Sequence, residues 1–278
     1  MEFHPQALVP GLRHIGYDVF ADARPSGLEE HSHPGAFEVC WIRRGCLSWQ
    51  VAGRDWSVGP GDLFLTLPDE RHGGRNGVMD RCELFWTSFS LDEAAAAGWL
   101  GHAESALLRR SLATSRIRVC RGPAGIGERF AGMLSALAEP DPLTPAVVRS
   151  GLTLLLSEVR IAYARAATGG RQVSSRIARA LAIMHEQLAT GVAVDAIAGQ
   201  VGLRPSQFRA VFRSETGFSP QEHLLRLRVE RAKELLADRR RSVTAVALAC
   251  GFASSQYFAT AFRRSTGFTP RSWRQRAA

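Results

Sequence analysis

The chain has few of the sequence features that mark secreted, membrane or zinc-module proteins. Its 278 residues contain five cysteines, which are scattered and never form a CxxC pair, so they indicate neither a disulfide framework nor a cysteine-rich zinc module. There is no apolar run of about 18 residues that could cross a membrane, and the first residues show no basic segment followed by an apolar stretch. We therefore expect a soluble protein of the cytoplasm with reduced thiols and no membrane partner.

Positive charge is not in excess in the first part of the chain. Residues 1–170 carry 17 basic and 19 acidic residues, whereas residues 171–278 carry 18 basic and 7 acidic residues. With 278 residues, of which 45% are hydrophobic, the chain is long enough for two domains with separate cores. Because the whole positive excess lies in one of them, we expect that domain to bind a polyanion such as DNA.

The basic part contains a repeated segment. GLRPSQFRAVFRSETGFSP at residues 202–220 returns in altered form as GFASSQYFATAFRRSTGFTP at residues 251–270. In each copy two phenylalanines lie four residues apart on one helix face, and a glycine follows where a helix end favours a left-handed residue. With the related segments VDAIAGQVG and VTAVALACG just upstream, the repeat predicts two helix-turn-helix units at about 192–216 and 242–266. The residues concerned are Phe208, Phe212 and Gly217, and Phe258, Phe262 and Gly267.

Capping residues mark the ends of the predicted helices. Ser219, Pro220 and Glu222 have the form of a capping box with proline at the first helical position. Ser242 can cap the first helix of the second unit, whereas the corresponding Ala193 has no side-chain oxygen. Leucines between the units predict one long helix that would hold the two recognition helices at a fixed distance. They can enter successive major grooves if they lie about 34 Å apart along the duplex.

The exposed faces of the two basic helices supply candidate DNA contacts. With the phenylalanines buried, Arg209 can bind guanine O6 and N7, and Gln256 can bind adenine N6 and N7. Arginines at the rims, such as Arg213, position a protein on phosphates more often than they specify a base. The predicted DNA-binding residues are Arg204, Ser206, Gln207, Arg209, Arg213, Ser254, Ser255, Gln256, Thr260, Arg263 and Arg264.

Residues 174–276 resemble the DNA-binding domain of the AraC/XylS family of bacterial transcription regulators. The resemblance rests on AIAGQVGL, FRAVFRSETGFSP, LRVERAKELL, AVALACGF and YFATAFRRSTGFTPRSWR, in this order and at family spacing. It implies two helix-turn-helix subdomains, joined by a helix, that bind an asymmetric site over about two turns of double-stranded DNA. It also implies a homodimer and contact with RNA polymerase, and it favours activation over repression.

The rest of the chain changes from strands to helices. Residues 12–92 contain short segments such as EVCWIRRG, RDWSVGPGD and CELFWTSFSL, separated by turns, which favours a sandwich or small barrel. Amphipathic spacing predicts helices over 104–113, 127–138 and 145–167, which either complete the domain core or form a dimer interface. Residues 168–172 are the expected linker to the DNA-binding half.

A histidine-rich motif lies in the strand-rich part. The spacing HxHx4Ex6G begins at His31 and is followed by PGD at residues 60–62 and by PxxxH ending at His72. This pattern resembles the two motifs of the cupin barrel, although the asparagine usual after the last histidine is missing. The resemblance implies a site for one divalent metal, whose donors would be His31, His33, Glu38 and His72. Imidazole nitrogens with a carboxylate suit transition metals such as iron, manganese, nickel or zinc.

The same side chains allow three roles. They can hold a divalent metal, line a pocket for an effector without metal, or serve only the structure. Several tryptophans lie in the same region, and one of them could give a ligand an aromatic platform. The predicted effector pocket consists of His31, His33, Glu38, Trp41 and His72.

Together the two resemblances describe an α+β chain with a cupin-like effector-binding domain at 1–95, a helical dimerisation and linker region at 96–170, and an all-α DNA-binding domain at 174–278. The favoured function is a sequence-specific transcription regulator, not an enzyme, that responds to a small molecule in the barrel. A metal-dependent cupin enzyme with a DNA-binding tail is the alternative, but it leaves the tandem repeat unexplained. A constitutive, nonspecific DNA-binding protein would leave the barrel pocket without a role.

Overall fold

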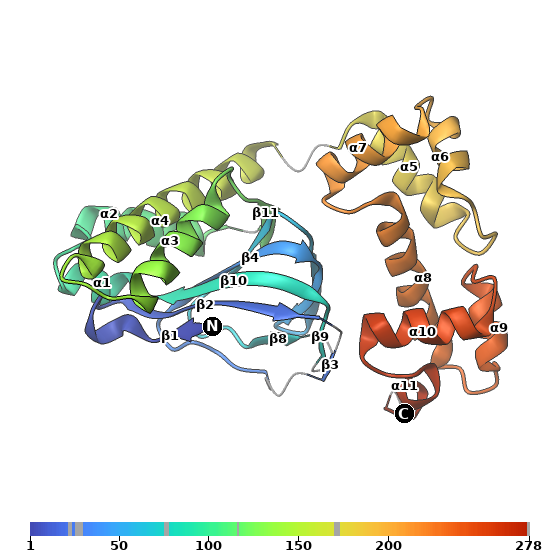
Figure 1. Cartoon of the computed structure of the whole chain (residues 1–278), viewed down its shortest axis with the longest axis horizontal. Coiled ribbons are helices and arrows are strands. Elements are labelled where there is room, and N and C mark those ends of the chain that lie inside the picture. Colours follow the sequence, from blue (N-terminus) through green and yellow to red (C-terminus); the bar gives the residue numbers. More distant parts are fainter. Residues whose placement is uncertain (22–23, 26–29, 75–77, 116, 170–172, 277–278) are drawn as a thin grey trace. The chain divides into compact units, whose positions relative to one another are not determined.

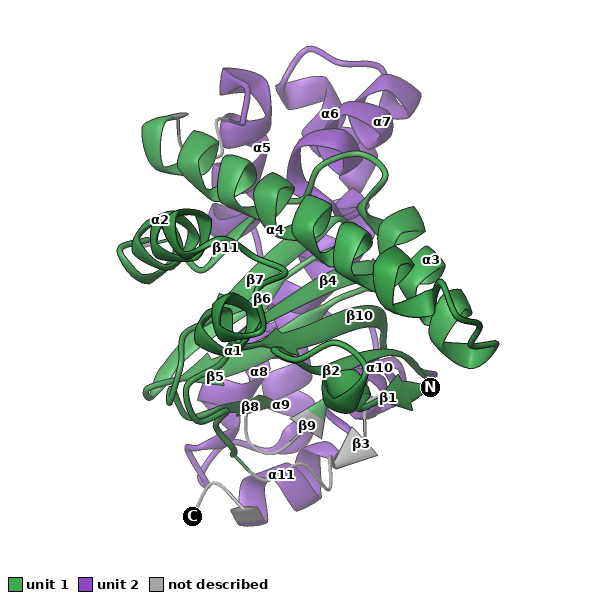
Figure 2. Cartoon of the chain, turned by 90° about the vertical axis from the view of Figure 1, so that its left-hand side faces the viewer, with its two compact units in different colours: residues 1–20, 26–171 green, residues 21–25, 172–278 purple. Residues whose placement is uncertain are grey.

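The computed structural model divides the chain into two compact units (Figure 2). One comprises residues 1–20 and 26–171, and the other residues 21–25 and 172–278. The first is rich in strands and carries helices, whereas the second is helical over its main segment, so the predicted α+β fold class is confirmed. The structure describes residues 1–21, 24–25, 30–74, 78–115, 117–169 and 173–276.

The first unit is built on antiparallel sheets (Figure 1). Short elements of this unit are η1 (Pro5–Ala7) and β9 (Val78–Met79), whereas the short strand β3 (Arg24–Pro25) belongs to the other unit. A smaller sheet has the order β6 (Arg54–Val58), β5 (Leu47–Val51) and β8 (His72–Gly74). The main sheet has the order β1 (Glu2–Phe3), β2 (Leu12–Phe20), β10 (Cys82–Phe89), β4 (Phe37–Gly45), β7 (Asp62–Thr66) and β11 (Val119–Arg121).

The central strand β4 is buried on both faces. Successive side chains of a strand point to opposite sides of the sheet. Phe37 and Val39 accordingly pack into the cluster that includes the helices of this unit, and Cys40 and Ile42 pack into a second cluster with the smaller sheet. Glu38 stands on the same side as Cys40, which places a carboxylate in the layer between the two sheets. This second cluster is filled by side chains of the chain itself, including Trp49.

Among the described residues, four α-helices belong to the first unit, and α3 and α4 lie alongside one another over the main sheet (Figure 1). Helix α4 continues through positions 168 and 169, which sequence analysis assigned to a linker; the remaining linker positions 170–172 lie outside the described residues. The short strand β11, in a region expected to be helical, pairs with β7. The helices are α1 (Leu91–Ala96), α2 (His102–Ala113), α3 (Ile126–Ala138) and α4 (Thr144–Gly169).

The second unit has two small cores joined by one long helix, α8. The paired phenylalanines are fully buried, with Phe208 and Phe212 in one core and Phe258 and Phe262 in the other. Among the described helices of the chain, none is long and apolar enough to cross a bilayer. The helices of this unit are α5 (Ser175–Glu186), α6 (Val194–Gln200), α7 (Pro205–Thr216), α8 (Pro220–Leu236), α9 (Val243–Ala249), α10 (Ser255–Thr266) and α11 (Pro270–Arg276).

The predicted helix ends are confirmed. Gly217 and Gly267 close α7 and α10 with φ values of 84° and 74°, a conformation that glycine adopts without a steric cost. Ser219 and Glu222 form the capping box of α8. Ser242 caps α9 by accepting a hydrogen bond from the backbone N–H of Ala245, whereas Ala193 begins α6 without a side-chain cap.

The two helix starts provide a matched test of capping. Ser242→Ala should lower the free energy of unfolding by about 1 kcal/mol, and Ala193→Ser should raise it by about 1 kcal/mol. The backbone at both positions is already extended, as an N-cap requires, so neither change needs the chain to move. Urea denaturation of the full chain measures both effects. Equal stability of wild type and both variants would show that the first turns of α6 and α9 do not depend on a side-chain cap.

Candidate DNA-binding surface and histidine cluster

Helices α7 and α10 present most of the predicted DNA-binding side chains to solvent. Arg204 directly precedes α7, and Arg213 lies in its last turn. Arg209, Ser254 and Ser255 are half-buried. The hydroxyl of Ser254 accepts a hydrogen bond from the backbone N–H of Tyr257 at 3.1 Å, so it also serves as the cap of α10. The exposed predicted residues are Arg204, Ser206, Gln207, Arg213, Gln256, Thr260, Arg263 and Arg264.

Arg209 is held by a carboxylate of the preceding helix. Its guanidinium forms an ion pair with Asp195 of α6, and both side chains remain substantially exposed. An exposed pair of this kind contributes about 0–1 kcal/mol. The pair can therefore orient Arg209 in the free protein and be exchanged for contacts with DNA at little cost.

Tyr257 is an exposed residue that the sequence analysis passed over. Its side chain on α10 is 57% exposed, which is unusual for a large aromatic residue. The signal lay in the repeat itself: when Phe208 is aligned with Phe258, Tyr257 takes the position of Gln207, a predicted contact residue. We therefore add Tyr257 to the candidate DNA-binding surface.

In the first unit the structure brings together the four predicted metal ligands. His31 and His72 pair as an isolated antiparallel bridge, and the rings of His31, His33 and His72 lie 4.5–5.2 Å apart between centroids. The Glu38 carboxylate lies 3.0 Å from Nε2 of His72 and 3.5 Å from Nε2 of His33. Hereafter these four residues are called the histidine cluster.

Electrostatics hold Glu38 ionised in spite of its burial. Burial alone would raise its pKa, but hydrogen bonds from His33 and His72 lower the pKa to about 2. Burial lowers the pKa of His72, yet the hydrogen bond to Glu38 outweighs it, and the net shift is upward. Nδ1 of His72 donates to the carbonyl oxygen of Glu70 at 2.8 Å. Because the ionised Glu38 carboxylate can only accept hydrogen bonds, Nε2 of His72 has two options. It either carries a proton as well, which makes the imidazole positively charged, or it binds a cation together with Glu38.

The donor geometry fits a divalent metal held by the three histidines, and Glu38 lies beside two of them. Ligands bound to zinc at about 2.1 Å in a tetrahedron lie about 3.4 Å from one another, and the two Glu38–histidine distances are 3.0 and 3.5 Å. One nitrogen from each of the three histidines lies within 4.8 Å of the others. Thr66 and Ser88 lie opposite Glu38 on the neighbouring strands, and their buried hydroxyl oxygens have no hydrogen-bond partner among the described residues. Such atoms are costly unless a ligand satisfies them.

Trp41, the fifth predicted pocket residue, is not part of this site. It stands three positions after Glu38 on β4 and therefore faces the opposite side of the sheet. There its ring lies 5.7 Å from the ring of Phe85, among the side chains that pack against the helices. Trp49 lies next to the histidine cluster: its buried ring is 6.0 Å from the ring of His72, and its Nε1 has no hydrogen-bond partner among the residues that the structure describes.

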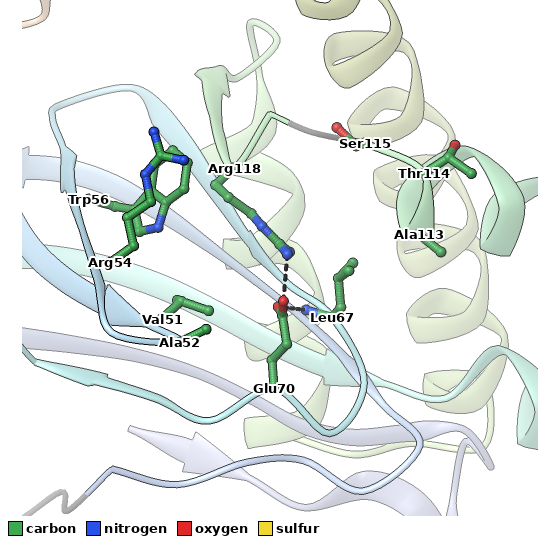
Figure 3. A pocket seen from close by; sticks show the side chains of 10 residues that line it. All are labelled: Val51, Ala52, Arg54, Trp56, Leu67, Glu70, Ala113, Thr114, Ser115 and Arg118. Atoms are coloured by element: carbon green, nitrogen blue, oxygen red, sulfur yellow. Dashed lines mark hydrogen bonds and ion pairs between the residues drawn. The ribbon is translucent and has the colours of Figure 1, made fainter.

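A surface pocket of about 520 Å³ is lined in part by Leu67 and Glu70, which lie near His72 in the sequence (Figure 3). Glu70 points toward Arg118 and accepts a 2.8 Å hydrogen bond from the backbone N–H of Leu67. At another wall of the pocket, the guanidinium of Arg54 lies 4.7 Å from the ring centroid of Trp56. Because the carbonyl group of Glu70 also accepts from His72, this residue joins the pocket to the histidine cluster.

Comparisons with known proteins agree with both halves of the structure. The HTH-type transcriptional activator RhaS of Escherichia fergusonii is 36% identical over 107 residues, 38% of this chain and 38% of that protein. RhaS of Escherichia coli O9:H4 is 38% identical over 102 residues, 37% of each chain. A transcriptional regulator from Chromobacterium violaceum with an AraC-type DNA-binding domain is 31% identical, covering 37% of this chain and 92% of that chain, with a TM-score of 0.35.

The matches to RhaS thus span well under half the length of either chain. Family models cover more of the sequence. An AraC-like ligand binding domain matches residues 19–156, which include the histidine cluster, and a helix-turn-helix domain matches residues 197–276, which include α7 and α10. The chain therefore belongs to the AraC family of transcription regulators.

Proposed function

We propose that this chain is a transcription activator whose second unit binds promoter DNA in the cytoplasm and contacts RNA polymerase. The tandem repeat supports the proposal most directly, because α7 and α10 occur in equivalent positions of two subdomains and both expose basic and polar side chains. Helix α8 contacts helices of both subdomains and so holds the two recognition helices on one scaffold. Such a scaffold can address two successive turns of the major groove.

We propose further that a small-molecule effector binds the first unit at the histidine cluster, through a divalent metal held by His31, His33, Glu38 and His72. When bound, the metal supplies open coordination positions for oxygen atoms of the effector. The protein contributes the ionised Glu38 carboxylate and the fixed orientation of His72. A ligand that favours one of two states of the regulator changes its occupancy of DNA by its differential affinity for those states.

An enzymatic role for the histidine cluster is the alternative. A metal-dependent cupin enzyme would use the same four donors, so the cluster alone does not separate the two functions. The matches of both halves to regulator domains favour the regulator. The two differ in outcome: an effector is released unchanged from the full-length protein, whereas a substrate is converted.

A homodimer through α4 is part of the proposal. Val147, Leu154 and Ile161 follow one another at intervals of seven and are exposed apolar residues. Residues at this interval form a stripe along one helix face. An exposed apolar stripe favours contact with a second copy, as the family resemblance implies.

Base recognition by Arg209 can be tested by substitution. Arg209→Ala should lower affinity mainly for sites with the preferred base pair, by about 1–3 kcal/mol, because a bidentate contact with guanine is lost. Arg213→Ala is the matched control and should weaken binding to all sequences alike. Selection from a random DNA library followed by affinity measurement distinguishes them. A uniform loss in both variants would assign Arg209 to phosphate binding.

The second prediction concerns the metal. Untagged full-length protein analysed by plasma mass spectrometry should contain near-stoichiometric divalent metal, and His31→Ala/His33→Ala should lose it because two of four donors are removed. His102→Ala, an exposed histidine at the start of α2, is the control and should retain the metal. If the protein binds no metal even after reconstitution, the remaining interpretation is that the histidine cluster binds an organic effector directly.

The third prediction concerns the dimer. Leu154→Glu should convert a dimer into a monomer, because it places a charge in the middle of the apolar stripe. Thr153→Glu, an exposed neighbour on another side of α4, should leave the dimer intact. Sedimentation velocity of the full-length protein measures both. A dimer that persists in Leu154→Glu would place the interface elsewhere.

A further inference from the structure

Five histidine rings form a continuous row in the first unit. The rings of His4 and His14 lie 4.5 Å apart, and those of His14 and His33 lie 5.7 Å apart. His33 in turn contacts His31 and His72 of the histidine cluster. The chain has eight histidines, so more than half of them gather in this one place. Three belong to the cluster already described, and the other two have a carboxylate of their own.

That carboxylate is Glu2, on the edge strand β1. Glu2 and His4 are two positions apart along the chain and therefore emerge on the same side. The register pairs Glu2 with Gly16 and Phe3 with Ile15, which brings His4 beside His14 on the neighbouring strand β2. Backbone pairing of two strands thus places one carboxylate and two imidazoles together.

The distances match a metal site as closely as those of the histidine cluster. Oε1 of Glu2 lies 3.3 Å from Nδ1 of His14 and 3.8 Å from Nε2 of His4. One donor atom from each of the three residues lies within 4.8 Å of the others. Two ligands of one zinc ion are about 3.4 Å apart in a tetrahedron and at most about 4.2 Å apart. A small side-chain rotation therefore brings all three donors onto one ion.

Simple ion pairing does not account for this grouping. The side chains are 64% exposed at His4, 45% at Glu2 and 36% at His14, and pairs this open contribute little to stability. A second imidazole beside the first adds repulsion whenever both are protonated. A shared cation instead favours both neutral imidazoles and the carboxylate at once.

We propose that Glu2, His4 and His14 form a second, solvent-facing site for a divalent transition metal such as zinc, nickel or cobalt. Three protein donors leave coordination positions for water. The second site is independent of the proposed effector site, because the two share no ligand. The contact between His14 and His33 nevertheless places them side by side, so a loaded first unit holds two ions.

Metal counting in full-length protein tests the proposal. Metal-free protein is titrated with Zn²⁺ in the presence of a competing chelator, and bound zinc is measured after equilibrium dialysis. Wild type should bind two ions per chain, and Glu2→Gln/His4→Ala should lose one of them, the weaker. His31→Ala/His33→Ala should lose the tighter ion and keep the weaker. His102→Ala is the matched control and should bind two.

Each outcome separates the two sites. Wild type that binds no ion overturns the second site, as does a Glu2→Gln/His4→Ala variant that binds as many ions as wild type. A His31→Ala/His33→Ala variant that loses no ion removes the metal from the histidine cluster while leaving the second site in place. The substituted residues Glu2 and His4 are exposed, and unchanged circular dichroism and thermal unfolding confirm that the variant is folded.

Discussion

The alternation of side chains along β4 is the constraint on which the first unit depends. This strand is covered by helices on one face and by the smaller sheet on the other. Each of its buried side chains therefore packs into one of two hydrophobic clusters. Glu38 is the polar exception on the side of the smaller sheet. A buried carboxylate is tolerated only with partners, and His33 and His72 supply them. A shift of one residue in register would exchange the two faces and remove the site.

The second unit follows a different rule, the four-residue spacing of the buried phenylalanines. Each pair fixes which face of α7 or α10 turns inward, and the opposite face is left exposed to solvent. Duplication of this arrangement on both sides of α8 gives two similar surfaces with different side chains. Arg209 in the first copy is balanced by Asp195 of α6, whereas Tyr257 is exposed in the second. The two candidate DNA-binding surfaces are therefore chemically distinct.

The sequence predicted best what depends on local spacing. The glycine ends of α7 and α10, the capping box at Ser219 and the cap at Ser242 are all confirmed, because each is determined within a few residues. Contacts between segments that are distant in the sequence were harder to predict. Strand β11 forms by pairing with β7, and its three residues alone do not predict that pairing. Trp41 was predicted to line the pocket as an aromatic platform, but strand alternation turns its side chain to the opposite face of the sheet.

The packed interior of the first unit has an evolutionary consequence. The layer between the sheets is occupied by the chain's own side chains, while the polar groups gather at His31, His33 and the strand residues beside them. In the proposed effector site, few positions would determine ligand preference, and two of them lie in the loop before β4. Substitutions in that loop leave the core volume unchanged. Under the proposed function, substitutions at these positions would change the ligand without rebuilding the hydrophobic core of the first unit.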